Sequence, residues 1–288
     1  MKLLLQRLFA FLLLLIAGQE AANAQLNVDL QIDRRQFIVH ESVPLAVRLT
    51  NRAGKELLLH GDNRRPWLSI QVTNQKGNIV PPYKPLAFQA AKIPVGRSVA
   101  KQIDLNSLFP LHSFGKYTVY TVVTLPTGET FQSGRKTFDI TKGRTIYEQR
   151  VGLGGQSRDY RLITFAPSKT SYLYFQAELV EQRQVALTYP IGEMLRHRAP
   201  EATVDKSGRL NVLYLGAPDR FIHVLIDSTG KVSDRTIYKR GRSGDPRLIA
   251  FADGEVKVAG GTVFDPKALK AQRDKLRKIS ERPSLLFK

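Results

Sequence analysis

The 288 residues include no cysteine, and this absence excludes several classes of protein. A chain without cysteine has no disulfides, no thiolate ligands for zinc and no cysteine nucleophile, and it cannot be anchored through a lipid-modified cysteine. Its folded parts must therefore be stabilised by their own hydrophobic cores. A hydrophobic content of 42% is close to that of ordinary globular proteins, so the sequence has the material for such cores.

Acidic residues are also scarce, because 25 Asp and Glu stand against 44 Lys and Arg and give a net charge of +19. A charge of this sign favours acidic partners such as anionic lipid, acidic polysaccharide, lipopolysaccharide or nucleic acid. The solubility of a generally basic protein would explain the same charge, and the sequence leaves both explanations open.

A single long apolar run occurs, over residues 8–17, and it lies close to the N-terminus. Basic residues precede it and Ala-Asn-Ala follows at 22–24, which is the pattern of a secretory signal peptide. A run of about ten residues is shorter than the roughly 20 that a membrane-spanning helix needs. We therefore expect a signal peptide over residues 1–24 and a mature protein that is periplasmic or secreted, with no integral membrane span after cleavage. An uncleaved anchor is the alternative.

Short strands separated by turns are expected over residues 25–140. Val43, Leu45, Val47 and Leu49 alternate with other residues in the two-residue period of a half-buried strand. Glycine-containing turn signals recur between such segments. Seven or so strands at this spacing predict an antiparallel β-sandwich.

The stretches VPLAVRLTN, WLSIQVTNQKGNIV and IPVGRSVAKQIDLNSLFPLHSFGKYTVYT resemble immunoglobulin-like domains of exported bacterial proteins. They are also similar to the β-sandwich of the bacterial intracellular proteinase inhibitor family. The resemblance covers about residues 35–140 and is carried by turn and core positions, so it implies a fold and no activity. It implies that Tyr117 lies near the start of a late strand, like a tyrosine corner. No inhibitory loop signature is present.

Repeated hairpins are expected over residues 141–265, where Asp-x-x-Gly or Asp-Gly turns begin at Asp205, Asp227 and Asp253. They resemble pieces of β-propeller blades, yet about 120 residues make roughly three blades, fewer than a closed propeller has. We predict a compact antiparallel β domain, with a partial propeller that closes by oligomerising as the alternative. Calcium binding by these aspartates would need further oxygen ligands nearby, which the sequence does not show.

A basic helical tail is predicted over residues 266–288, because Asp265-Pro266 is a typical helix start. The expected class is thus all-β with one short C-terminal α-helix. Basic side chains surround a narrow apolar stripe in this tail and could contact an anionic surface; the candidates are Lys270, Arg273, Arg277 and Lys278. The alternative is a solvated helix that docks on the β domain.

A second candidate ligand site is the group Arg64, Arg65 and Trp67, which contains the only tryptophan. If Leu68 and Ile70 face the core, strand alternation turns Trp67 outward, where it could stack on a sugar ring or a base. The alternative is that Trp67 packs in the sandwich core.

No catalytic, cofactor or metal site is predicted, since the five histidines lack metal-ligand spacing and the glycine-rich stretches lack the P-loop lysine. The expected function is that of an exported, non-enzymatic binding or scaffold protein of the cell envelope. Its partner would be another envelope protein or an anionic polymer, and nucleic acid is not expected. The alternatives are an envelope-polymer hydrolase with a site in the C-terminal domain, and an inhibitor or assembly chaperone that acts through the N-terminal domain.

Overall fold

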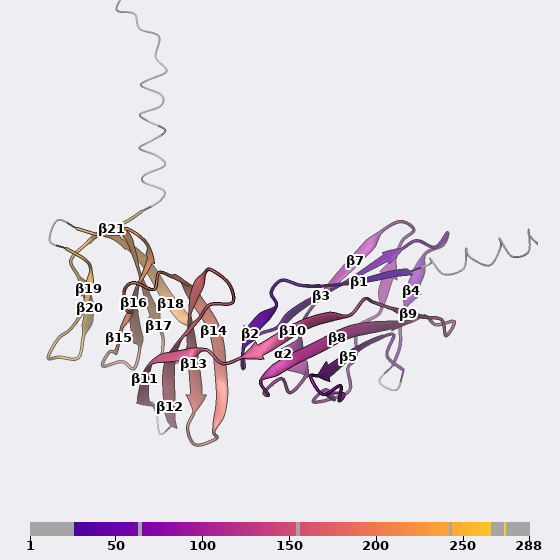
Figure 1. Cartoon of the computed structure of the whole chain (residues 1–288), viewed down its shortest axis with the longest axis horizontal. Coiled ribbons are helices and arrows are strands. Elements are labelled where there is room, and N and C mark those ends of the chain that lie inside the picture. Colours follow the sequence, from indigo (N-terminus) through magenta and orange to yellow (C-terminus); the bar gives the residue numbers. More distant parts are fainter. Residues whose placement is uncertain (1–25, 63–64, 154–155, 242–243, 266–273, 275–288) are drawn as a thin grey trace, which may run out of the picture. The chain divides into compact units, whose positions relative to one another are not determined.

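The computed structural model describes residues 26–62, 65–153, 156–241, 244–265 and Asp274, and these residues are almost entirely β-strand and turn (Figure 1). The all-β class is thereby confirmed. The chain divides into two compact units, Met1–Lys142 and Gly143–Lys288. In the described segments, no helix has the length and apolar character needed to cross a membrane. The predicted signal peptide lies outside the described residues, as does the predicted tail helix except Asp274.

The first unit contains two main sheets. One sheet has the order β1-β3-β7 and is antiparallel throughout; its strands are β1 (Leu26–Ile32), β3 (Pro44–Asn51) and β7 (Ser98–Asp104). The other has the order β2-β10-β8-β5 with β9 also paired to β8; its strands are β2 (Gln36–Ile38), β5 (Leu68–Asn74), β8 (Gly115–Thr124), β9 (Thr130–Gln132) and β10 (Lys136–Thr141). A short ladder joins β4 (Leu57–Leu59) to β6 (Ala91–Ile93), and one helical turn, α2, spans Leu105–Leu108.

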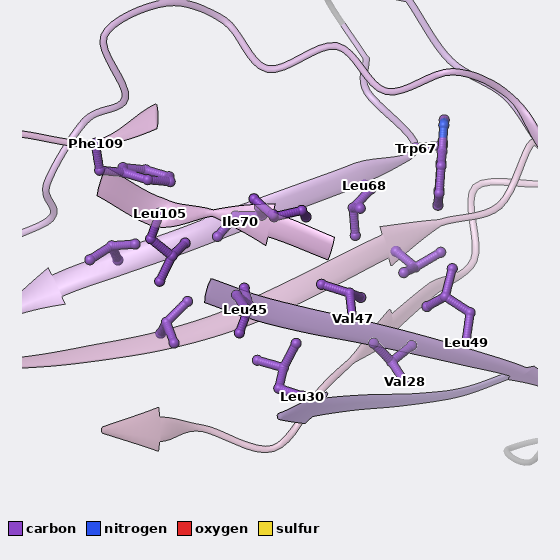
Figure 2. Close-up of a cluster of buried hydrophobic side chains, with 14 of the residues drawn as sticks. Val28, Leu30, Leu45, Val47, Leu49, Trp67, Leu68, Ile70, Leu105 and Phe109 are labelled. Atoms are coloured by element: carbon purple, nitrogen blue, oxygen red, sulfur yellow. The ribbon is translucent and has the colours of Figure 1, made fainter. Parts of the chain in front are cut away.

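The core of this unit lies between the two main sheets. The alternating residues Leu45, Val47 and Leu49 of β3 are fully buried, as the sequence pattern predicts. They belong to one hydrophobic cluster with Leu68 and Ile70 of β5 in the opposite sheet (Figure 2). Burial of each such side chain contributes about 1.5–3 kcal/mol, so the cluster explains how the unit folds without disulfides.

The second unit begins with two antiparallel meanders. The first sheet has the order β11-β12-β13-β14, with strands β11 (Arg144–Leu153), β12 (Gln156–Phe165), β13 (Ser171–Leu179) and β14 (Gln184–Met194). The second has the order β15-β16-β17-β18-β21, with strands β15 (Glu201–Val204), β16 (Leu210–Ala217), β17 (Arg220–Ile226), β18 (Val232–Lys239) and β21 (Thr262–Val263). A separate hairpin pairs β19 (Arg247–Ala250) with β20 (Val256–Ala259).

These three sheets form successive layers, because the middle sheet is covered on both faces. On one face, Val212 and Tyr214 of β16 share a hydrophobic cluster with Leu162 and Phe175 of the first sheet. On the other, Leu213 and Leu215 of β16, with Phe221, pack against the partly buried Leu248 and Val258 of the hairpin. The predicted antiparallel fold of repeated hairpins is confirmed, and after the β19–β20 hairpin the chain returns to the middle sheet as β21.

The repeated aspartates shape the turns of these hairpins. Asp205 Oδ1 accepts backbone hydrogen bonds from Ser207 (2.9 Å) and Arg209 (3.0 Å). Asp227 Oδ1 accepts the equivalent bonds from Thr229 (2.8 Å) and Lys231 (3.0 Å). Gly208 and Gly230 follow with φ of +72° and +86°, a conformation that favours glycine. Both carboxylates are thus used in turn formation, which confirms the interpretation based on the sequence.

Candidate anion-binding cleft

A cleft of about 440 Å³ lies at one end of the β11–β14 sheet. Its walls come from the ends of these strands and from the segment that follows β14; they are Arg144, Ile146, Thr164, Phe165, Ala166, Ser171, Met194, Arg196, Arg198, Ala199 and Pro200. A second hollow of about 440 Å³ adjoins it and shares Ser171, Met194 and Arg196 with the first. Lys169 and Glu193 line this second hollow.

Strand register explains why residues so far apart in sequence meet at this end of the sheet. Antiparallel pairing places Arg144, at the start of β11, opposite Thr164 near the end of β12. It likewise places Ser171, at the start of β13, opposite Met194 at the end of β14. The backbone N–H of Leu195 then donates to the carbonyl oxygen of Leu215 (2.8 Å), which fixes the start of the following segment against the middle sheet.

Three cations that line the cleft or the adjoining hollow are not compensated by ion pairs. Arg144, Lys169 and Arg196 are exposed, and none of them forms an ion pair with any residue that the structure describes. Glu193 is the acidic residue of the lining, and its carboxylate accepts a hydrogen bond from the hydroxyl of Tyr172 (3.3 Å). The cleft therefore offers an excess of positive charge to a ligand.

Arg196 and Ser171 form a preorganised pair in the region shared by both hollows. The Nε–H of Arg196 donates to the Oγ of Ser171, a residue that is only 5% exposed. This bond leaves the two terminal nitrogens of the guanidinium group and the hydroxyl proton of Ser171 to donate to a ligand. A guanidinium fork held in this way suits the bidentate recognition of a carboxylate, phosphate or sulfate group.

Arg198 has a different role, because its charge is compensated. Its guanidinium group pairs with Glu201 (3.0 Å) and Asp245, and it lies 4.9 Å from the ring centroid of Phe221. Ile146, which is 38% exposed, and Phe165 add an apolar surface beside the cations. The cleft thus suits a ligand in which an anionic group is attached to an apolar moiety or to a sugar ring.

The hydrogen-bond partner of the Ser171 hydroxyl also bears on whether that hydroxyl could act as a nucleophile. Within the described part of the chain, its Oγ has Arg196 as its hydrogen-bond partner, and a guanidinium group cannot accept a proton from a nucleophile. The described residues likewise contain no group of three His, Cys, Asp or Glu side chains that could together hold a metal ion. This arrangement can bind an anion, and Arg196 itself cannot act as a general base for Ser171.

The group Arg64, Arg65 and Trp67 does not form a ligand surface around the tryptophan. Trp67 is 1% exposed and belongs to the core cluster that Figure 2 shows. Its Nε1–H donates to the carbonyl oxygen of Phe88 (3.1 Å), and its ring contacts that of Phe88 edge-on. The core packing that the sequence left open is therefore observed. The residue immediately precedes β5, so strand alternation does not dictate where its side chain points. Arg65 is exposed, whereas Arg64 lies outside the described residues.

The other predicted ligand contacts, Lys270, Arg273, Arg277 and Lys278, also lie outside the described residues. Sequence reasoning did not identify Arg144, Lys169 and Arg196, because no local motif joins them. Their common signal is a basic residue at or beyond a strand end, and it becomes meaningful only once the register of the sheet is known.

No protein-family model matches the sequence, and no curated protein matches it.

Proposed function

We propose that the protein is an exported, non-enzymatic binding protein of the cell envelope, and that it takes an anionic ligand in the cleft at the end of the β11–β14 sheet. The observation that carries the proposal is the convergence of Arg144, Lys169 and Arg196 on adjoining hollows, without an ion-pair partner among the described residues. The signal-peptide pattern over residues 1–24 supports export, and the net charge of +19 supports an acidic ligand.

Binding would proceed in two stages in this proposal. The positive charge of the protein attracts an acidic polymer over a distance limited by the Debye length, about 8 Å at physiological ionic strength. At the cleft, Arg196 then receives one carboxylate, phosphate or sulfate group through its two terminal nitrogens, with Arg144 and Lys169 beside it. The apolar surface of Ile146 and Phe165 contacts the body of the same repeat unit.

We further infer that the first unit is an immunoglobulin-like sandwich that serves as a scaffold. Its N-terminal segment contributes β1 to one sheet and β2 to the other, and β2 runs parallel to the final strand β10. In addition, the hydroxyl of Tyr117, near the start of β8, donates to the carbonyl oxygen of Ser113 (2.9 Å). Both features match that fold, the second being the tyrosine corner that the resemblance implies.

The cleft can be tested with a charge-matched pair of triple variants. The first is Arg144→Ala, Lys169→Ala and Arg196→Ala; the control is Lys76→Ala, Lys231→Ala and Arg247→Ala, which removes three exposed cations elsewhere. Binding of the mature protein to dextran sulfate, lipopolysaccharide and uncharged dextran is measured by calorimetry at two salt concentrations. We expect the cleft variant to bind the anionic polymers at least ten-fold more weakly than the control variant, and neither variant to bind dextran.

Equal losses in the two variants would show that the overall charge, and not the cleft, is responsible for binding. Absence of binding by the unaltered protein to either anionic polymer would contradict the proposal itself.

A further inference from the structure

Two histidines and a tyrosine converge in the first unit, whereas the cleft belongs to the second unit. His40 lies in the turn between β2 and β3, Tyr83 in the connection between β5 and β6, and His112 in the connection between α2 and β8. The ring centroids of His40 and His112 are 5.0 Å apart, and the ring planes are inclined by 36°. The hydroxyl oxygen of Tyr83 lies 2.7 Å from Nε2 of His112.

The backbone around each of these residues is held in place. His40 has a φ of +69° in a turn in which the N–H of Glu41 donates to the carbonyl oxygen of Ile38 (3.2 Å). The N–H of Tyr83 donates to the carbonyl oxygen of Leu108 (2.9 Å), which ties that connection to α2. His112 follows Leu111, whose side chain is fully buried. The cluster is thus positioned by the fold of this unit.

The spacing of the imidazoles fits a shared metal ion. Metal–nitrogen distances of about 2.0–2.1 Å and a tetrahedral angle place the centroids of two coordinating imidazoles about 5 Å apart. The observed separation of 5.0 Å agrees with this value. We propose that His40 and His112 bind one divalent transition-metal ion of the class that prefers imidazole, such as Zn²⁺ or Cu²⁺.

Tyr83 supplies the outer contact that such a ligand needs. Since Nε2 of His112 faces the Tyr83 hydroxyl, Nδ1 is the nitrogen left to bind the metal, and Nε2–H then donates to the phenolic oxygen. Such a partner fixes the tautomer and the orientation of a ligating histidine. Tyr83 is therefore a positioning residue, and His112 and His40 are the ligands.

The neighbouring carboxylate does not complete the site. Glu41 is 2% exposed, its Oε2 accepts from the backbone N–H of Ile38 (3.1 Å), and its other oxygen pairs with Arg34. Two protein ligands leave the remaining metal positions to water or to an external ligand. The site is thus of the open, exchangeable kind, and it is independent of the proposed function of the cleft.

Calorimetric titration of the mature, metal-stripped protein with Zn²⁺ tests the site. We expect one ion per chain and a loss of at least ten-fold in affinity in His112→Ala and in His40→Gly, the latter retaining a residue suited to positive φ. Tyr83→Phe should weaken binding by about ten-fold or more while the stoichiometry stays at one, as loss of an outer-shell partner typically does. The controls are His60→Ala and His197→Ala, which remove exposed histidines elsewhere.

Electron paramagnetic resonance of the Cu²⁺-loaded protein gives a second readout, since coordination by two imidazole nitrogens produces nitrogen hyperfine splitting that His112→Ala should reduce. Circular dichroism of the metal-free variants verifies that they are folded. Zn²⁺ affinity that is unchanged in folded His112→Ala, or that falls equally in His60→Ala, would overturn the proposal. Either outcome would leave the cleft unaffected.

Discussion

The hydroxyl of Tyr214 lies where a side chain on residue 192 would have to be, since a Cβ built on Gly192 would be 2.1 Å from that oxygen. The same hydroxyl donates to the carbonyl oxygen of Ile191 (3.0 Å), which links the middle sheet of the second unit to β14. Glycine at 192 is therefore required by the close approach of the two sheets.

Gly192→Ala should lower the free energy of unfolding by about 1–3 kcal/mol, because the added methyl group must displace a buried tyrosine. Urea denaturation followed by circular dichroism measures the change. Gly152→Ala is the control, since a Cβ there meets no atom within 4 Å. Combining Gly192→Ala with Tyr214→Phe removes the closest atom, so the two losses should be less than additive. Strict additivity would show that the clash is not the cause.

The second unit should lose stability between about pH 10 and pH 12. Burial raises the pKa of Tyr214 and of Tyr189 to about 12. In the unfolded state the pKa of tyrosine is about 10. A pKa that is higher in the folded state adds to stability, and this contribution is fully present below the unfolded-state pKa. It is lost as the pH rises through the folded-state pKa. Thermal unfolding across this range should show the decline. Tyr214→Phe should make it shallower, and an equally steep decline in that variant would contradict the assignment.

Replacement of a turn aspartate should destabilise the second unit without any calcium effect. Asp227→Ala removes a carboxylate that accepts two backbone hydrogen bonds, so we expect a loss of about 1 kcal/mol. Because the carboxylate is used within the turn, millimolar Ca²⁺ should leave the melting temperature of the unaltered protein unchanged. A rise with Ca²⁺ that disappears in Asp227→Ala would instead identify a calcium site.

Trp67 should behave as a core residue in solution. Trp67→Ala should cost about 3–5 kcal/mol, as expected for removal of a fully buried aromatic side chain. Since it is the only tryptophan, its fluorescence reports on the first unit alone. We expect a blue-shifted emission that acrylamide quenches weakly, whereas strong quenching in the folded protein would place the ring at the surface.

In the cleft, Arg196→Lys should bind dextran sulfate almost as weakly as Arg196→Ala. A lysine keeps the charge, but it cannot donate to Ser171 through Nε while presenting two parallel donors to the ligand. Calorimetry at fixed ionic strength separates the two effects. Full affinity in Arg196→Lys would mean that charge alone is recognised.

The strand pattern of the first unit was readable from sequence, because one face of β3 is buried and the other is not, which produces the alternation of Leu45, Val47 and Leu49. The layers of the second unit were not readable, because β16 is covered on both faces and its burial is nearly continuous. Trp67 immediately precedes β5, so the alternation of side chains within that strand does not apply to it, and its side chain points into the core.

The candidate sites could not be predicted from the sequence, for a different reason. Arg196 and Ser171, like His40 and His112, are brought together by strand register and by turns, and neither pair follows a local motif. A single sequence contains the side chains of such a site without their spatial relationship.

The parallel pairing of β2 with β10 also sets an order of events during synthesis. Gln36 pairs with Asp139, so the last strand of the first unit must have emerged before the second strand acquires its partner. Contacts between residues so distant in sequence form late, because the loop-closure entropy must be overcome first. A nascent chain that ends before Lys136 would expose the unpaired edges of β2 and β8, and such edges are where intermolecular strand pairing begins. Synthesis of β10 is therefore the step that covers the facing edges of β2 and β8, between which it lies in the sheet.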